Sequence, residues 1–149
     1  MYERQLTALL VIDPYNEIEH KRPANQNETE YVSQLLGKVK RFAQAHGVHV
    51  WSIAHPAKLY RDKDGSLPEP TLYDISGSAN WANKADVGLV IHRDPNKDPT
   101  RTDILIRKVR FKSVGKIGMT SLRYERATGR YSEIPLAAAA GNARGYAND

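Results

Sequence analysis

The hydrophobic pattern begins with a short uninterrupted run. Thr7 to Asp13 contains five apolar residues without alternation and ends on a single carboxylate. Such a run predicts a strand buried on both faces, as in a parallel sheet covered by helices. Asp13 would then lie at the carboxyl end of the strand, where α/β sheets bind their ligands. The alternative is a core strand that ends at a turn, since Asp13 and Pro14 both favour turns.

The next periodic segment, Glu28 to His46, has its apolar residues at helical spacing. They are Val32, Leu35, Leu36, Val39, Phe42 and Ala43. Asn27 and Glu30 are spaced as in a capping box, and Gly47 supplies a C-terminal stop. The pattern therefore predicts one amphipathic helix.

A second strand is predicted from Val48 to Ala54, directly after this helix. Strand, helix and strand in this order form a βαβ unit, whose crossover is nearly always right-handed. Asp13 and His55 would therefore lie side by side at one edge of the sheet. His55 suits a structural histidine, a metal ligand or a polar sensor beside a nucleotide phosphate. The metal is the least favoured, because the histidines lack ligand spacing.

Two polar segments leave this expected edge, Tyr15 to Asn27 and Lys58 to Pro70. Their basic side chains include Lys21, Arg22, Lys58, Arg61 and Lys63. Basic loops suit a nucleic-acid backbone, and Tyr60 and Trp81 would offer stacking surfaces for single-stranded DNA. The alternative is a pair of solvated loops of ordinary charge.

The rest of the chain predicts mainly strands. We expect a turn at 76–78, a helical piece at 79–84, strands at 87–93, 103–111, 117–125 and 131–134, and a disordered tail at 135–149. Within the second of these strands, alternation places Lys108 and Arg110 on one face and Arg107 on the other. Two neighbouring cations indicate either a solvated face or a site for a phosphate.

Composition narrows the possible classes. A chain of 149 residues suits one domain with its own core, and the absence of cysteine excludes disulfides and thiolate chemistry. The net charge of +5 mildly favours an anionic partner. No apolar run is long enough for a membrane span or a secretory signal, so we expect no membrane partner and a cytoplasmic location.

Five stretches occur in an order that resembles a known family. They are Leu9–Asp13, Ile53–Pro56, Tyr73–Trp81, Asn83–Asp86 and Arg107–Phe111. Together they resemble the C-terminal half of the DnaB- and Twinkle-type replicative DNA helicases, in particular the phage and prophage primase-helicases with a TOPRIM domain. The resemblance implies that 1–134 belong to a RecA-like P-loop ATPase core, a mostly parallel α/β sheet with antiparallel strands at its C-terminal end.

The resemblance also implies a role for each matching position. Asp13 would be the Walker B acid that binds Mg²⁺, and His55 would be the sensor of the ATP γ-phosphate. Lys108 and Arg110 would be the fingers that reach the ATP site of the adjacent subunit in a hexameric ring. Arg93 would be a further nucleotide contact.

The partners implied by the family are single-stranded DNA and ATP with Mg²⁺, in the cytoplasm of a bacterial or phage-infected cell. The Lys58 to Pro70 loop would be one of the central DNA-binding loops, with Lys21 and Arg22 near another.

One departure from the family is decisive for activity. The Walker A motif G-x-x-x-x-G-K-[ST] does not occur in these residues, and we identify no catalytic glutamate. We therefore expect half an ATPase, from a truncated gene or a prophage remnant, that does not hydrolyse ATP by itself. A non-catalytic fragment that binds single-stranded DNA or a subunit is the alternative. The first strand also resembles that of isochorismatase-like hydrolases, but their Asp-Lys-Cys triad requires a cysteine.

Overall fold

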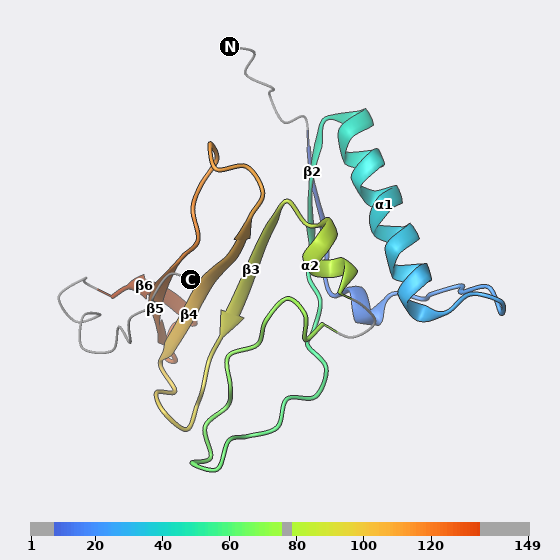
Figure 1. Cartoon of the computed structure of the whole chain (residues 1–149). Helices are drawn as coiled ribbons and strands as arrows, with labels where there is room; N and C mark the ends of the chain where they lie inside the picture. Colours follow the sequence, from blue (N-terminus) through green and yellow to red (C-terminus); the bar gives the residue numbers. More distant parts are fainter. Residues whose placement is uncertain (1–7, 76–78, 135–149) are drawn as a thin grey trace.

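The computed structural model describes residues 8–75 and 79–134 (Figure 1). Its elements are β1 (Ala8–Ile12), the 3₁₀ turn η1 (Tyr15–Glu17), α1 (Glu28–His46), β2 (Val48–Ser52), α2 (Asn80–Lys84), β3 (Val87–His92), β4 (Arg101–Val109), β5 (Gly118–Glu125) and β6 (Arg130–Glu133). Each predicted helix or strand that it describes begins and ends within two residues of its expected bounds. Thr7, the expected turn at 76–78 and the expected tail at 135–149 lie outside the described residues.

Local signals set the bounds of α1, which are those predicted. The Asn27 Oδ1 atom accepts the Glu30 N–H at 2.9 Å, and the Glu30 carboxylate accepts the Asn27 N–H at 3.3 Å. This reciprocal pair is a capping box and satisfies free donors at the helix start. Gly47 ends the helix at φ 62°, a left-handed conformation that favours glycine.

The sheets combine parallel and antiparallel pairing, and the predicted α/β class is confirmed. β1 and β2 pair in parallel from Ala8↔Val48 to Ile12↔Ser52, with α1 as the crossover. The four later strands form an antiparallel sheet in the order β3-β4-β5-β6. Parallel pairing is thus limited to one pair in the described residues, where we expected it to predominate. Short loops join the later strands, and such loops permit only antiparallel neighbours.

The expected burial of β1 on both faces is wrong for the described residues. Leu9 is 61% exposed, and Leu10 and Val11 are also exposed. β1 has β2 along one edge only, and α1 lies along one side of the pair (Figure 1). One helix and one neighbour cannot cover both faces and both edges of a strand.

The apolar core joins segments that are distant in the sequence. Tyr15 from η1, Val32 from α1 and Trp81 from α2 are buried together, and the Trp81 ring meets Tyr15 edge-on at a centroid distance of 4.8 Å. Leu35, Leu36, Ala54 and Ile75 pack against this cluster. Tyr15 therefore belongs to the core, although it begins a segment predicted to be a polar loop. Trp81 is only 6% exposed, so the expectation that it stacks on DNA is wrong.

Candidate nucleotide and DNA interface

The carboxyl ends of β1 and β2 place two predicted site residues at one edge of the parallel pair. Beyond the strands the main chains stay joined, because the Tyr15 N–H donates to the Ile53 carbonyl at 2.7 Å. The His55 N–H then donates to the Asn16 Oδ1 atom at 2.8 Å. Asp13 and His55 therefore lie at the same edge, both exposed, as the βαβ pattern predicts.

The residues at this edge could bind a metal only together with ligands from outside the protein, such as water or substrate phosphates. Among the described residues, no group of three or more histidines and carboxylates is arranged to hold an ion. Asp13 offers an exposed carboxylate at the edge. Mg²⁺ is commonly held by one or two carboxylates together with water and substrate phosphates. The edge thus fits a nucleotide-bound Mg²⁺ better than a metal held by the protein alone.

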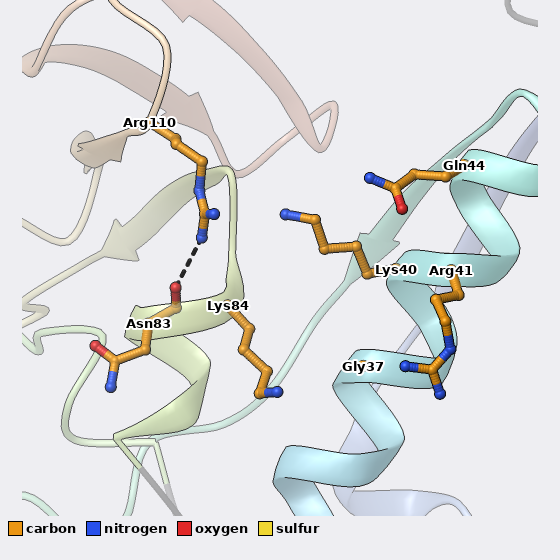
Figure 2. Close-up of a pocket in the computed structure, with 7 residues that line it drawn as sticks. All are labelled: Gly37, Lys40, Arg41, Gln44, Asn83, Lys84 and Arg110. Carbon is orange, nitrogen blue, oxygen red and sulfur yellow. Dashed lines mark hydrogen bonds between the residues drawn. The ribbon is translucent and has the colours of Figure 1, made fainter.

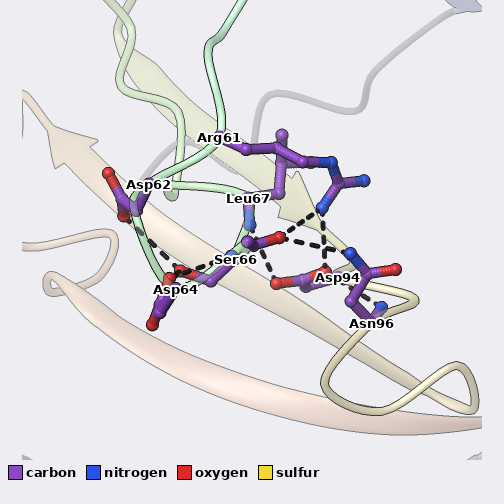
Figure 3. A network of polar contacts seen from close by, with 8 residues as sticks. Arg61, Asp62, Asp64, Ser66, Leu67, Asp94 and Asn96 are labelled. Carbon is purple, nitrogen blue, oxygen red and sulfur yellow. Dashed lines mark hydrogen bonds and ion pairs between the residues drawn. The ribbon is translucent and has the colours of Figure 1, made fainter.

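A buried carboxylate braces the loop between β2 and α2 (Figure 3). The Asp94 side chain, 5% exposed, accepts the Leu67 N–H at 2.9 Å and the Asn96 N–H at 3.1 Å. Arg61 faces the same carboxylate at 3.7 Å. The bond from Leu67 holds the pKa of Asp94 below its usual range, because it favours the charged form. Asp94 therefore ties this loop to the end of β3.

The brace divides the basic residues of the loop into two groups. Arg61 also donates to the Gly65 carbonyl at 2.8 Å, so its guanidinium holds the loop together. Lys58 and Lys63 are exposed. Tyr60 is 77% exposed, and the Lys58 ammonium lies 5.6 Å from its ring centroid. Lys58, Tyr60 and Lys63 are therefore exposed to a nucleic acid, whereas Arg61 also holds the loop together, and its contact with DNA stays a prediction.

Three further predicted residues lie outside this loop. Lys21 and Arg22 are exposed in the segment between η1 and α1. The Arg93 guanidinium donates to the Pro99 carbonyl and lies 4.8 Å from the Tyr124 ring centroid. These contacts hold the β3–β4 connection against β5, and the nucleotide contact of Arg93 stays a prediction.

Lys108 and Arg110 reach the C-terminal end of α2. The Lys108 Nζ atom donates to the Ala82 and Asn83 carbonyls, and the Arg110 Nη2 atom donates to the Asn83 carbonyl at 2.8 Å. Their shared target agrees with the predicted shared face. Cations are favoured at this end of a helix, where carbonyls lack partners. Desolvation, followed by the charge of Arg110, lowers the pKa of Lys108.

One carboxylate links these cations to α1. Arg110 Nε lies 2.9 Å from Asp86 Oδ1, and Lys40 Nζ lies 2.7 Å from the same oxygen. The neighbouring Arg107 has a different partner and pairs with Glu69 at 2.5 Å. The β3–β4 register shifts here from Gly88↔Lys108 to Leu89↔Ile106, so the strict alternation of Arg107 and Lys108 stays a prediction.

Sequence reasoning missed two groups of polar residues at the site. Asp94 gave only a turn signal, because Pro95 and Asn96 follow it. Lys40 and Arg41 lie on α1 and Lys84 lies on α2, and only the packing of α1 against α2 brings them together (Figure 2). No spacing rule within one element reports such a meeting.

The fold is that of a RecA-like α/β protein, as predicted. No protein-family model matches the chain. It is similar to a solved DnaB-like replicative helicase, in a structure that also reports its interactions with primase, with a TM-score of 0.68 and 23% identity over 85% of this chain and 30% of that one. It is also 50% identical over 130 residues to the Twinkle homolog protein, chloroplastic/mitochondrial, of Arabidopsis thaliana.

The sequence match gives the type of protein within that fold. The chain corresponds to part of a DnaB/Twinkle-type helicase, which confirms the family resemblance, and the phage or prophage detail stays a prediction. The match covers 85% of this chain but 18% of the Arabidopsis protein. No helix in the described parts of the chain is long and apolar enough to cross a bilayer.

Proposed function

We propose that the chain contributes the DNA-binding and phosphate-sensing part of an ATP-dependent replicative helicase, which unwinds duplex DNA at the fork as a hexameric ring. The observation that carries the proposal is the 50% identity to the Twinkle homologue over 130 residues. The exposed loop with Lys58, Tyr60 and Lys63 supports it, since aromatic and basic side chains together suit single-stranded nucleic acid. The proposed location remains the cytoplasm of a bacterial or phage-infected cell.

In this proposal the edge of the parallel pair faces the nucleotide. Asp13 binds the Mg²⁺ that accompanies ATP, and bound Mg²⁺ neutralises charge on the phosphates. His55 contacts the γ-phosphate, and its main chain is already fixed by the hydrogen bond to Asn16. Arg93 would contribute a further positive charge only after release from the Pro99 carbonyl.

The fingers act on a neighbouring subunit in this proposal. Lys108 and Arg110 exchange the carbonyls at the end of α2 for phosphate oxygens of the adjacent ATP. The exchange is feasible because both side chains carry N–H donors and are at least partly exposed. A cation supplied in trans is worth about 10³–10⁵ in rate in nucleotide hydrolases.

A second candidate function is non-catalytic binding of single-stranded DNA or of a subunit. The exposed β1 favours it, because an uncovered strand edge and apolar face suit a protein partner. In this alternative the loop still binds DNA, but adding a half that contains Walker A in trans gives no ATP hydrolysis, whereas the helicase proposal expects hydrolysis.

Titration of the chain with a labelled single-stranded oligonucleotide tests the proposal. We expect saturable binding that excess unlabelled single strand reverses and that the same quantity of duplex competes for less well. The reason is that Tyr60 needs an unpaired base to stack on. Equal competition by the duplex would contradict the assignment of the loop to single-stranded DNA.

The isolated chain should not hydrolyse ATP, because it contains no Walker A motif to hold the phosphates. Phosphate release with Mg²⁺ should equal that of the Lys108→Ala/Arg110→Ala double variant, measured with a coupled phosphate assay. A wild-type rate well above that of the double variant would mean that the chain forms a complete site by another route.

A further inference from the structure

An open pocket lies between α1 and α2 and is lined mainly by cations (Figure 2). Its volume is about 370 Å³. The lining includes Lys40 and Arg41 from α1, Lys84 from α2, and Arg110 beyond β4. Two helices and the segment after β4 therefore contribute positive side chains to one place.

The charges around this pocket are not balanced. Asp86 is the one carboxylate that pairs with lining cations in the described residues, and it is shared by Lys40 and Arg110. Within those residues, Arg41 and Lys84 form no ion pair. Four cations thus share one carboxylate, which leaves a local excess of positive charge that favours an anion.

Gly37 marks the point where the two unpaired cations converge. A Cβ atom at this position would lie 3.5 Å from an Arg41 guanidinium nitrogen and 3.8 Å from the Lys84 ammonium. Glycine inside a helix costs about 1 kcal/mol relative to alanine. At this position it leaves open space beneath both cations, and two like charges held close together repel unless an anion lies between them.

We propose that this pocket binds a phosphate group, either of a nucleic-acid backbone or of a nucleotide polyphosphate. Arginine offers paired donors to phosphate oxygens, and lysine adds a point charge. Asp86 competes with the ligand for Lys40 and Arg110 and so moderates its affinity. The site goes beyond the proposed function, which gives Lys40, Arg41 and Lys84 no role, and it does not depend on ATP hydrolysis.

Binding of inorganic triphosphate to the full chain, measured by isothermal titration calorimetry, tests the site. We expect Arg41→Ala/Lys84→Ala to weaken binding about tenfold, because two of four cations are lost. The control Lys112→Ala/Lys116→Ala removes the same charge from an exposed connection and should change the affinity less than about twofold. Equal weakening by the two double variants would overturn the proposal.

A variant that is expected to strengthen binding distinguishes an effect on the site from damage to the fold. Asp86→Asn removes the competing carboxylate and keeps the side-chain shape, so it should tighten triphosphate binding about threefold. General destabilisation does not produce tighter binding. Unchanged or weaker binding, with an unchanged far-UV circular dichroism spectrum, would contradict the role given to Asp86.

Two parallel titrations, with ATP and with single-stranded DNA, show whether the bound phosphate belongs to a nucleotide or to a nucleic-acid backbone. If the Arg41→Ala/Lys84→Ala variant weakens only ATP binding, the ligand is a nucleotide, and if it weakens DNA binding, the ligand is the backbone. If neither changes and triphosphate binding is also unchanged, the pocket is not a phosphate site. Lys58→Ala/Lys63→Ala should leave triphosphate binding intact. A failure of the DNA-loop proposal is therefore distinguishable from a failure of the phosphate-site proposal.

Discussion

Trp81→Ala should lower the free energy of unfolding by about 3–5 kcal/mol, the largest stability effect expected of a single substitution in this chain. Trp81 is 6% exposed and meets Tyr15 edge-on at 4.8 Å. Its partners in the core come from η1 and α1. Losing the indole would therefore separate α2 from the rest of the core and leave a cavity in a cluster that has three buried residues in the described part of the chain.

Urea denaturation followed by far-UV circular dichroism measures this effect. Trp51→Ala is the matched control, because Trp51 is 44% exposed on β2 and should cost less than about 1.5 kcal/mol. Trp81→Phe should cost less than Trp81→Ala, since it keeps a ring and removes an indole N–H that has no hydrogen-bond partner among the described residues. Equal costs for the two alanine variants would contradict the placement of Trp81 in the core.

The second large effect concerns DNA. Lys58→Ala/Lys63→Ala should weaken binding of single-stranded DNA about tenfold at low salt. Each phosphate contact contributes about −0.7 to the slope of log affinity against log salt, so the slope should become less steep by about 1.4. These two lysines are exposed, whereas Arg61 is held by Gly65 and Asp94.

Fluorescence anisotropy over a series of salt concentrations measures both the affinity and the slope. Lys112→Ala/Lys116→Ala is again the control, because it removes equal charge from a connection outside the loop. A mere effect of net charge would change both double variants alike and would rule out a specific role for the loop.

Local structure was predictable because its signals lie within a few residues. The capping pair of Asn27 and Glu30 and the stop at Gly47 fixed α1, and the unbroken apolar run of β1 indicated a strand. The βαβ order was sufficient to place Asp13 and His55 at one edge. Motif order was sufficient for the family, which the identity to the Twinkle homologue confirms.

Burial was not predictable in the same way, because it depends on what covers a segment. The apolar run of β1 is typical of a strand enclosed on both faces, yet Leu9 is 61% exposed. Trp81 was expected to stack on single-stranded DNA, but its position on α2 places its side chain in the core. Both outcomes depend on tertiary contacts that no pattern within one segment reports.

Long-range polar contacts were equally invisible in the sequence. Arg110 and the Asn83 carbonyl are 27 residues apart, and the Leu67–Asp94 bond also spans 27 residues. The alternation of β4 predicted different surroundings for Arg107 than for Lys108 and Arg110, but it could not identify their partners. The basic pocket is the extreme case, because its cations come from two helices and from the segment after β4.

The most direct test of the proposed function is a titration of labelled single-stranded DNA at about 50 mM and 200 mM salt, with and without a Mg-ATP analogue. We expect binding that weakens at the higher salt concentration and ignores the analogue, as for a DNA-binding loop beside an incomplete ATP site. Binding that tightens with the analogue would mean that the site works without Walker A. Absence of DNA binding at the lower salt concentration would contradict the proposed function.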